Sequence, residues 1–329
     1  MPFYRKILRQ AWRVTWDHKY LWFFGLFAAF ISTGELEILT NVFTGGSEIS
    51  MSGFFTTLKD TNVFSAQGWE GMKLFMVQRP DAFFILLILL LIFLALFLFL
   101  LWLSVVSQTA IVQNTANIAN DKAASVKIGV QSGATHFWPI LGFNIMIKII
   151  VMLALAFLSW PLILGINGLD TLYVAAVYLI SVIVFLPIVI SLLFVAKYAI
   201  AYRIIKEEKW GNALRRGWLL FTDNWLISLE VALVFLAIFF FSSLLFLLIM
   251  SAIAVPYLLL LYFMGGLGMV FASWSFFVLG CLILFFLIAW FGSLMTVFQT
   301  SGWTYLFLEL TGKGGSSKLA RWFNQVAVK

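Results

Sequence analysis

The strongest constraint on this chain is its long stretches of apolar residues. Between Trp225 and Leu308 the only charged residue is Glu230, and the run Ala82–Val106 contains no charged residue. A helix rises 1.5 Å per residue, so about 20 apolar residues cross the roughly 30 Å hydrocarbon core of a bilayer. The runs therefore predict membrane-spanning helices.

The composition supports the same class of protein. Apolar residues make up 63% of the chain and charged residues 11%, whereas soluble domains average roughly 45–50% and about 25%. Such a chain cannot cover its own surface with polar groups, so we expect lipid to cover it. We predict an all-α integral membrane protein, with residues 1–329 as a single transmembrane domain.

Six transmembrane helices are expected, together with interfacial amphipathic helices. The spans begin near residues 20, 82, 137 and 172, and two more lie between residues 225 and 308. Residues 255–273 contain Pro256 and three glycines, which predicts a broken helix there. We expect this piece to re-enter the membrane or to lie at its interface, and eight spans are the alternative.

Basic residues gather on one side of the predicted spans. The other side, chiefly an outer loop over residues 33–81, holds only Lys59, Lys73 and Arg79. Because cytoplasmic segments of membrane proteins are enriched in Lys and Arg, both termini are predicted to be cytoplasmic, with residues 313–329 as a tail. The net charge of +7 therefore reflects membrane topology, and no nucleic-acid partner is expected.

Two segments have the pattern of amphipathic helices lying on a membrane surface. Residues 4–15 carry an apolar stripe at i, i+3, i+4, i+7 and i+8, with basic residues on the opposite face, and residues 210–223 repeat this stripe. Interfacial anchoring explains the pattern, and specific binding of anionic lipid headgroups is the sharper alternative. The predicted lipid or interface residues are Arg9, Trp12, Arg13, Arg215, Arg216 and Trp218.

The two segments also indicate an internal repeat. Aligning them pairs Trp218 with Trp12 and Asp223 with Asp17, and a fainter copy over residues 123–135 pairs Gly129 with Gly217. We predict three parallel repeats over residues 1–122, 123–209 and 210–313, each with a surface helix, an outgoing span and a returning span. Asp17, Thr135 and Asp223 are expected to cap the outgoing helices.

Several of these segments resemble a known family. Residues 17–26, Ala110–Lys122 and Ala213–Trp218 are similar to the membrane domain attached to some bacterial glycerophosphoryl diester phosphodiesterases and to related multi-pass membrane proteins. In those enzymes catalysis belongs to a separate soluble barrel domain, so no catalytic residue is carried over to this chain. The resemblance implies a multi-pass protein of the bacterial plasma (inner) membrane.

Polar residues inside predicted spans are the other candidates for a site, since charges in a membrane are costly and usually face protein. Lys148 and Glu230 are such residues, and Asn144 lies one turn before Lys148. A structural ion pair or a snorkelling lysine is the simpler interpretation, and a polar pathway between repeats is the functional one. His18 and His136 are interpreted as polar residues at helix starts, and no metal site is predicted.

No enzyme motif is visible, and neither catalytic residues nor cofactors are predicted. The leading hypothesis is a non-enzymatic module that interacts with membrane lipids, including anionic lipids, or with another membrane protein. The alternative is a small transporter or lipid-moving protein with a polar site around Lys148 and Glu230.

Overall fold

The computed structural model describes residues 3–32, 66–166 and 171–312 of the chain. All regular structure in these ranges is helical, which confirms the all-α class. The helices in chain order are α1 (Phe3–Asp17), α2 (Leu21–Ser32), α5 (Ala66–Gln78), α6 (Pro80–Ala119), α7 (Val126–Thr135), α8 (Phe137–Ile166), α9 (Thr171–Ile205), α10 (Trp210–Asp223), α11 (Trp225–Gly266) and α12 (Val270–Gly312).

Five helices in the described part of the chain are long and apolar enough to cross a membrane: α6, α8, α9, α11 and α12. This confirms a membrane-embedded fold. The first expected span corresponds to α2, whose 12 residues cover only about 18 Å. The total of six spans stays a prediction, because residues 33–65, which include most of the predicted outer loop, lie outside the described residues.

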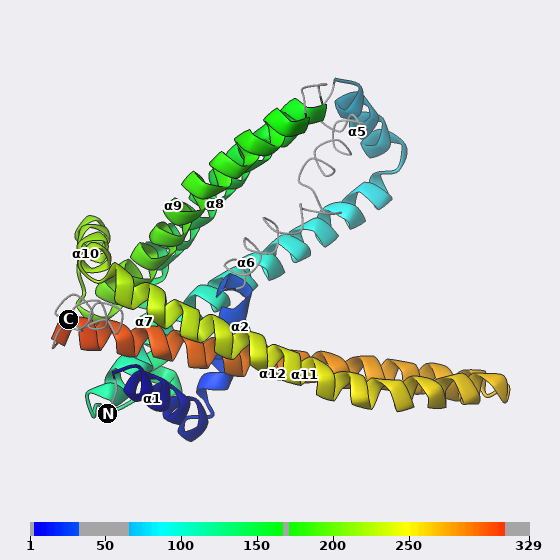
Figure 1. The fold of residues 1–329 in the computed structure, drawn as a ribbon. Helices are drawn as coiled ribbons and strands as arrows, with labels where there is room; N and C mark the ends of the chain where they lie inside the picture. Colours follow the sequence, from blue (N-terminus) through cyan, green and yellow to red (C-terminus); the bar gives the residue numbers. More distant parts are fainter. Residues whose placement is uncertain (1–2, 33–65, 167–170, 313–329) are drawn as a thin grey trace.

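The short helices α1, α7 and α10 gather at one end of the molecule, and the long helices extend from there as three arms (Figure 1). The arms are α6, the α8–α9 hairpin and the α11–α12 hairpin. We call their common base the hub, and its core includes the buried residues Ile7, Phe24, Ile111, Phe143, Tyr198 and Leu306. Along the arms most apolar side chains are exposed, as expected where lipid is the solvent.

Each of three short helices packs against a long helix that returns to the hub. Helix α7 packs against α6, α10 against α9 and α1 against α12, while α6, α9 and α12 also contact one another. Small residues lie at these contacts: Ala11 is fully buried, and a Cβ atom on Gly217 would lie 2.9 Å from backbone atoms of α9. Among the described helices, the first in the chain thus packs against the last. The internal repeat itself stays a prediction.

The last part of the chain differs from expectation at Pro256. Helix α11 runs through Pro256 without interruption and ends at Gly266, and α12 begins at Val270 after a turn in which Gly268 has φ 74°. The helix is thus broken within residues 255–273, as predicted, but at the glycines and not at Pro256, and these residues form the end of a helical hairpin. A proline removes a single N–H donor, here the one that would bond the carbonyl of Ala252, and the flanking apolar residues continue the helix.

The three predicted capping residues lie between a short helix and the next helix, as expected, but they do not act as caps. Asp17, Thr135 and Asp223 are each the last residue of a short helix. The Thr135 hydroxyl donates to the Gln131 carbonyl, and the residue that caps α11 is Asn224, whose side chain makes no capping hydrogen bond. These residues therefore mark the end of one helix and do not cap the next.

Candidate functional site

Helix α1 presents a surface of arginine and tryptophan away from the hub. Arg5, Arg9 and Arg13 are exposed, and their spacing of four residues places them in a row along one face. Trp12, with 54% of its surface exposed, and Trp16 lie beside this row. The two indole rings are 5.6 Å apart, so cationic and aromatic groups share one face of α1.

This arrangement corrects the predicted role of the apolar stripe. Tyr4, Ile7 and Ala11, which were expected to enter the lipid boundary, are buried in the protein core where α1 packs against α12. Trp12 belongs to the exposed face, and its ring meets Phe298 of α12 edge-on at 6.0 Å. Periodicity alone identifies a buried face, but it does not say whether lipid or protein buries it.

Helix α10 has a related exposed face. Ala213 and Gly217 are buried against α9, while Trp218, with 48% of its surface exposed, and Arg215 face outward. Arg216 is also exposed, but its guanidinium pairs with the carboxylate of Glu208 at 2.7 Å. Of the two predicted lipid-binding arginines on α10, Arg215 is therefore the one not committed to an ion pair among the described residues.

Two exposed cations, Arg5 and Lys127, are absent from the predicted interface residues. Lys127 lies on α7 two positions before Gly129, and Arg9 and Arg215 lie two positions before Ala11 and Gly217. All three cations are exposed, and each precedes the small residue with which its helix meets a long helix. The signal that could have found Lys127 is the spacing of two positions between the cation and the small residue, which α1, α7 and α10 share. It was overlooked because residues 123–135 have only a weak amphipathic pattern.

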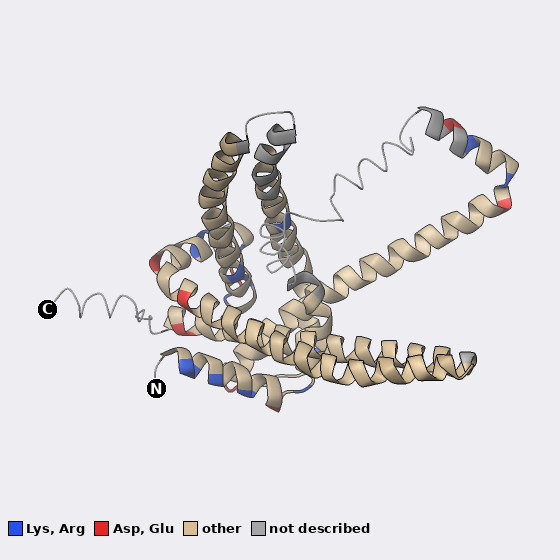
Figure 2. Ribbon diagram, turned by 45° about the vertical axis from the view of Figure 1, so that its right-hand side comes forward, with Lys and Arg blue, Asp and Glu red and all other residues tan. Residues whose placement is uncertain are grey.

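The charges of the molecule cluster at its two ends. Figure 2 shows Lys, Arg, Asp and Glu around the hub and on α5 at the far end of α6, with mostly uncharged helix between them. Lys73 and Arg79 belong to the far end and are exposed. An uncharged middle of this kind is what a bilayer core accommodates.

The predicted intramembrane polar residues have separate surroundings. Asn144 on α8 donates to the side-chain oxygen of Gln108 on α6 at 2.9 Å. Glu230 on α11 accepts a hydrogen bond from the Tyr4 hydroxyl on α1. Lys148 is exposed on α8, one turn further along the arm. The structure thus uses Asn144 and Glu230 to join helices, at two different contacts of the hub.

A second charge in the hub also joins helices. The ammonium group of Lys197 on α9 lies 4.3 Å from the centre of the Trp303 ring on α12, a distance at which cation–π attraction is effective. Lys6 on α1 pairs with Glu309 at the end of α12. Charged side chains therefore fix α1, α9, α11 and α12 to one another.

The histidines show no sign of a metal site. His136 Nδ1 is 2.9 Å from the Ser132 carbonyl, and the His18 ring meets Tyr20 edge-on at 6.0 Å. Within the described ranges no three His, Cys, Asp or Glu side chains form a group that could hold a metal ion.

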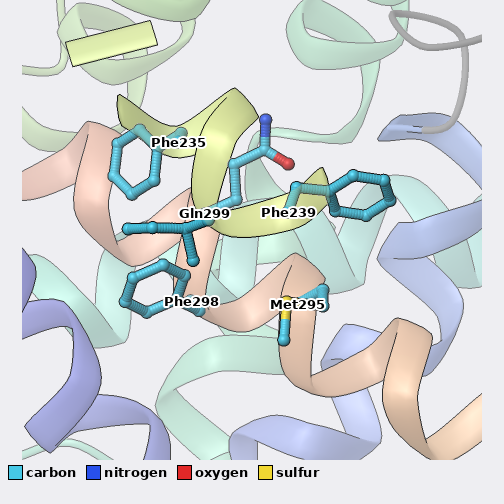
Figure 3. A pocket seen from close by; sticks show the side chains of 6 residues that line it. Phe235, Phe239, Met295, Phe298 and Gln299 are labelled. Atoms are coloured by element: carbon cyan, nitrogen blue, oxygen red, sulfur yellow. The ribbon is translucent and has the colours of Figure 1, made fainter. Parts of the chain in front are cut away.

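A small hollow lies between α11 and α12 beside the hub (Figure 3). It is lined by Phe235, Ile238 and Phe239 of α11 and by Met295, Phe298 and Gln299 of α12. Its volume, including space open to the surroundings, is about 210 Å³, below the roughly 300–1,000 Å³ of small-molecule sites. One amide on an otherwise apolar lining suits a lipid chain lying against the surface better than an enclosed substrate.

The long apolar helices and their charge distribution define an all-α protein embedded in a membrane. Comparison with known proteins places it no further: no family model, no curated protein and no solved structure matches the chain.

Proposed function

We propose that this protein is a non-enzymatic module of the bacterial plasma membrane that binds anionic lipid headgroups through the exposed faces of α1 and α10. In this proposal the hub and both termini are cytoplasmic, as the distribution of basic residues favours. The resemblance to the membrane domain of glycerophosphoryl diester phosphodiesterases is consistent with the same location.

The observation that carries the proposal is the face of α1. Its arginine row is exposed and Trp12 and Trp16 lie partly exposed beside it, while Tyr4, Ile7 and Ala11 are buried where α1 packs against α12. A free amphipathic helix must fold and orient on the membrane each time it binds. Here the protein core has already fixed both, so the cations meet the headgroups without that ordering cost.

The expected change in lipid association follows from the charge of each residue. A Lys or Arg close to an anionic membrane surface contributes about 1 kcal/mol, which is about a fivefold change in association. Arg9 and Arg215 are exposed and form no ion pair within the described part of the chain, whereas Arg216 is paired with Glu208. Replacing Arg9 and Arg215 together therefore tests the proposal with the smallest structural disturbance.

The experiment measures lipid preference in reconstituted bilayers. Electron paramagnetic resonance with spin-labelled phosphatidylglycerol and phosphatidylcholine reports which lipid contacts the protein more strongly. We expect the double variant Arg9→Gln and Arg215→Gln to lose most of the preference for phosphatidylglycerol. The matched control is Lys73→Gln with Arg79→Gln, which removes the same charge at the opposite end of the molecule and should leave the preference largely unchanged.

Two outcomes would contradict the proposal. One is an unchanged preference in the hub variant, which would instead favour a membrane-protein partner for this face. The other is an equal loss in both variants, which would show that only the net charge matters. The transporter alternative requires Lys148 and Glu230 to share one site, and because their described surroundings differ, we propose no second function.

A further inference from the structure

Lys148 is a charge on a membrane helix for which the described part of the chain supplies no counter-charge. It is the only charged residue of α8, and its side chain is exposed. Within the described ranges it forms neither an ion pair nor a hydrogen bond. The neighbouring helices α6 and α9 hold one acidic residue, Asp81, at the far end of α6. Because an unpaired charge in a bilayer is costly, we expect an anion from outside the described chain beside this lysine.

A neighbouring hydrogen bond shows which way Lys148 faces. Asn144 donates to Gln108 of α6, and Lys148 follows Asn144 by four residues, so it lies on the same face of α8, one turn further from the hub. The face that meets α9 is a different one, marked by Ala154 and Phe157. Lys148 therefore faces the space between α6 and α8, which separate as they leave the hub (Figures 1 and 2).

This lysine lies where the lipid-exposed part of α8 begins. Asn144 is the last residue of α8 buried where that helix meets α6. Residues 145–166 beyond it rise about 33 Å, close to the roughly 30 Å of a hydrocarbon core. Lys148 is in the first turn of this part, and its flexible stem can carry the ammonium group back toward the headgroups. Across the space, Phe97 and Leu94 share the face of Gln108 and are 53% and 49% exposed, so lipid covers them.

The amide pair next to Lys148 leaves one hydrogen-bond donor unused. A single hydrogen bond of 2.9 Å joins Asn144 Nδ2 to Gln108 Oε1. The amide nitrogen of Gln108 therefore keeps both of its hydrogens, and it has no partner among the described residues. Asn144 is only 9% exposed, so the packing of the hub holds the pair in place. Lys148 and the Gln108 amide together offer one cationic and one neutral donor, which suits a phosphate.

We propose that Lys148 and the Gln108 amide bind the phosphate of one anionic phospholipid, whose acyl chain lies against α6 in the space between the two helices. An anionic lipid is favoured over a zwitterionic one, because α6 and α8 place no carboxylate nearby that could receive a headgroup ammonium. A free phosphate has no apolar part to cover the exposed face of α6. The site is separate from the faces of α1 and α10, so it goes beyond the function proposed above and does not depend on it.

The experiment measures lipid binding to the purified full chain. Native mass spectrometry in detergent gives the association constants of added phosphatidylglycerol and of diacylglycerol, which has the same acyl chains and no phosphate. Lys148→Met removes the cation from an exposed position, and we expect phosphatidylglycerol to bind about fivefold more weakly or worse, with diacylglycerol binding unchanged. Lys148→Arg should keep most of the affinity. The matched control, Lys73→Met on α5, removes the same charge elsewhere and should have little effect.

A second variant tests the amide without changing Lys148. Gln108→Glu can still accept the hydrogen bond from Asn144, but its carboxylate repels a phosphate, so phosphatidylglycerol binding should again weaken by about fivefold or more. Both losses should persist in a chain that carries Arg9→Gln and Arg215→Gln, which separates this site from the faces of α1 and α10.

Three results would overturn the proposal. Equal phosphatidylglycerol binding by the wild-type and Lys148→Met proteins would show that no lipid phosphate meets this lysine, and would favour an acidic residue in a partner's membrane helix instead. An equal loss of diacylglycerol binding would show that altered packing, and not a lost phosphate contact, weakens the lipid. Displacement of phosphatidylglycerol by soluble glycerol phosphate would show that the site takes a free phosphate.

Discussion

Gly217 offers the most direct test of how α10 is held and therefore of where Arg215 and Trp218 point. A Cβ atom at this position would lie 2.9 Å from the Ala199 nitrogen and from the Val195 carbonyl oxygen. Both atoms belong to the backbone of α9, which cannot move aside as the end of a flexible side chain could. Gly217→Ala must therefore push α10 away from α9.

The expected change in the free energy of unfolding combines two opposing effects. Alanine is favoured over glycine in a helix interior by about 1 kcal/mol, whereas overpacking a close contact costs about 1–3 kcal/mol. The net expectation for Gly217→Ala is a loss of up to about 2 kcal/mol in the free energy of unfolding. At Gly211, on the same helix, an added Cβ atom would have no neighbour within 4 Å, so Gly211→Ala should be neutral or stabilising by up to about 1 kcal/mol.

The assay is equilibrium unfolding of the purified protein in mixed micelles with rising dodecyl sulfate, followed by tryptophan fluorescence. The difference between the two glycine variants isolates the clash, because helix propensity favours alanine in both. Equal stability of the two variants would refute the reasoning, since it would mean that α10 does not approach α9 at Gly217.

Three further predictions use the same unfolding assay. Tyr4→Phe removes the hydroxyl that donates to Glu230 and should cost about 1.5–3 kcal/mol, as expected for a hydrogen bond to a charged group; no loss would mean that this contact is unimportant for the hub. Ser301→Ala leaves the buried Thr115 hydroxyl without its partner at 3.0 Å and should cost about 1–3 kcal/mol, whereas an unchanged midpoint would argue against the pair. Glu207 has φ 53° just after α9, so Glu207→Gly should stabilise the protein by about 1 kcal/mol, and destabilisation would indicate that the side chain matters more than the backbone.

The membrane class and the helix ends could be predicted because they follow from local chemistry. Uninterrupted apolar runs leave no alternative to spanning helices, and the ends of α1, α7 and α10 were located at Asp17, Thr135 and Asp223. The chemistry of these ends could not be predicted, because a polar residue between two helices can belong to the end of one or to the start of the next. The break within residues 255–273 was predicted, but its place was not: in an apolar helix the one hydrogen bond missing at Pro256 does not outweigh the preference of its neighbours for helix, and the chain turns at the glycines.

The surroundings of the candidate residues required the structure. Residues 4–15 show that one face of the helix is buried, but only the packing against α12 shows that protein buries it. Lys197 and Glu230 could be recognised as charges near spans, yet their aromatic partners lie on helices distant in sequence. Such long-range pairs leave no trace in a single sequence, because nothing in the spacing of residues records which helices become neighbours.

The contact between α1 and α12 also has a consequence for the order in which the protein is made. Lys6 and its partner Glu309 are 303 positions apart. Because chains are synthesised at about 5–20 residues per second, the surface of α12 that binds α1 is made about 15–60 s after α1 itself. During that interval the buried face of α1, with Tyr4, Ile7 and Ala11, has no protein to cover it, and the surface of the membrane is the nearest apolar substitute. The nascent helix would then rest on the bilayer with the face that it later turns inward, and completion of α12 would roll it over to expose Trp12 and the arginine row.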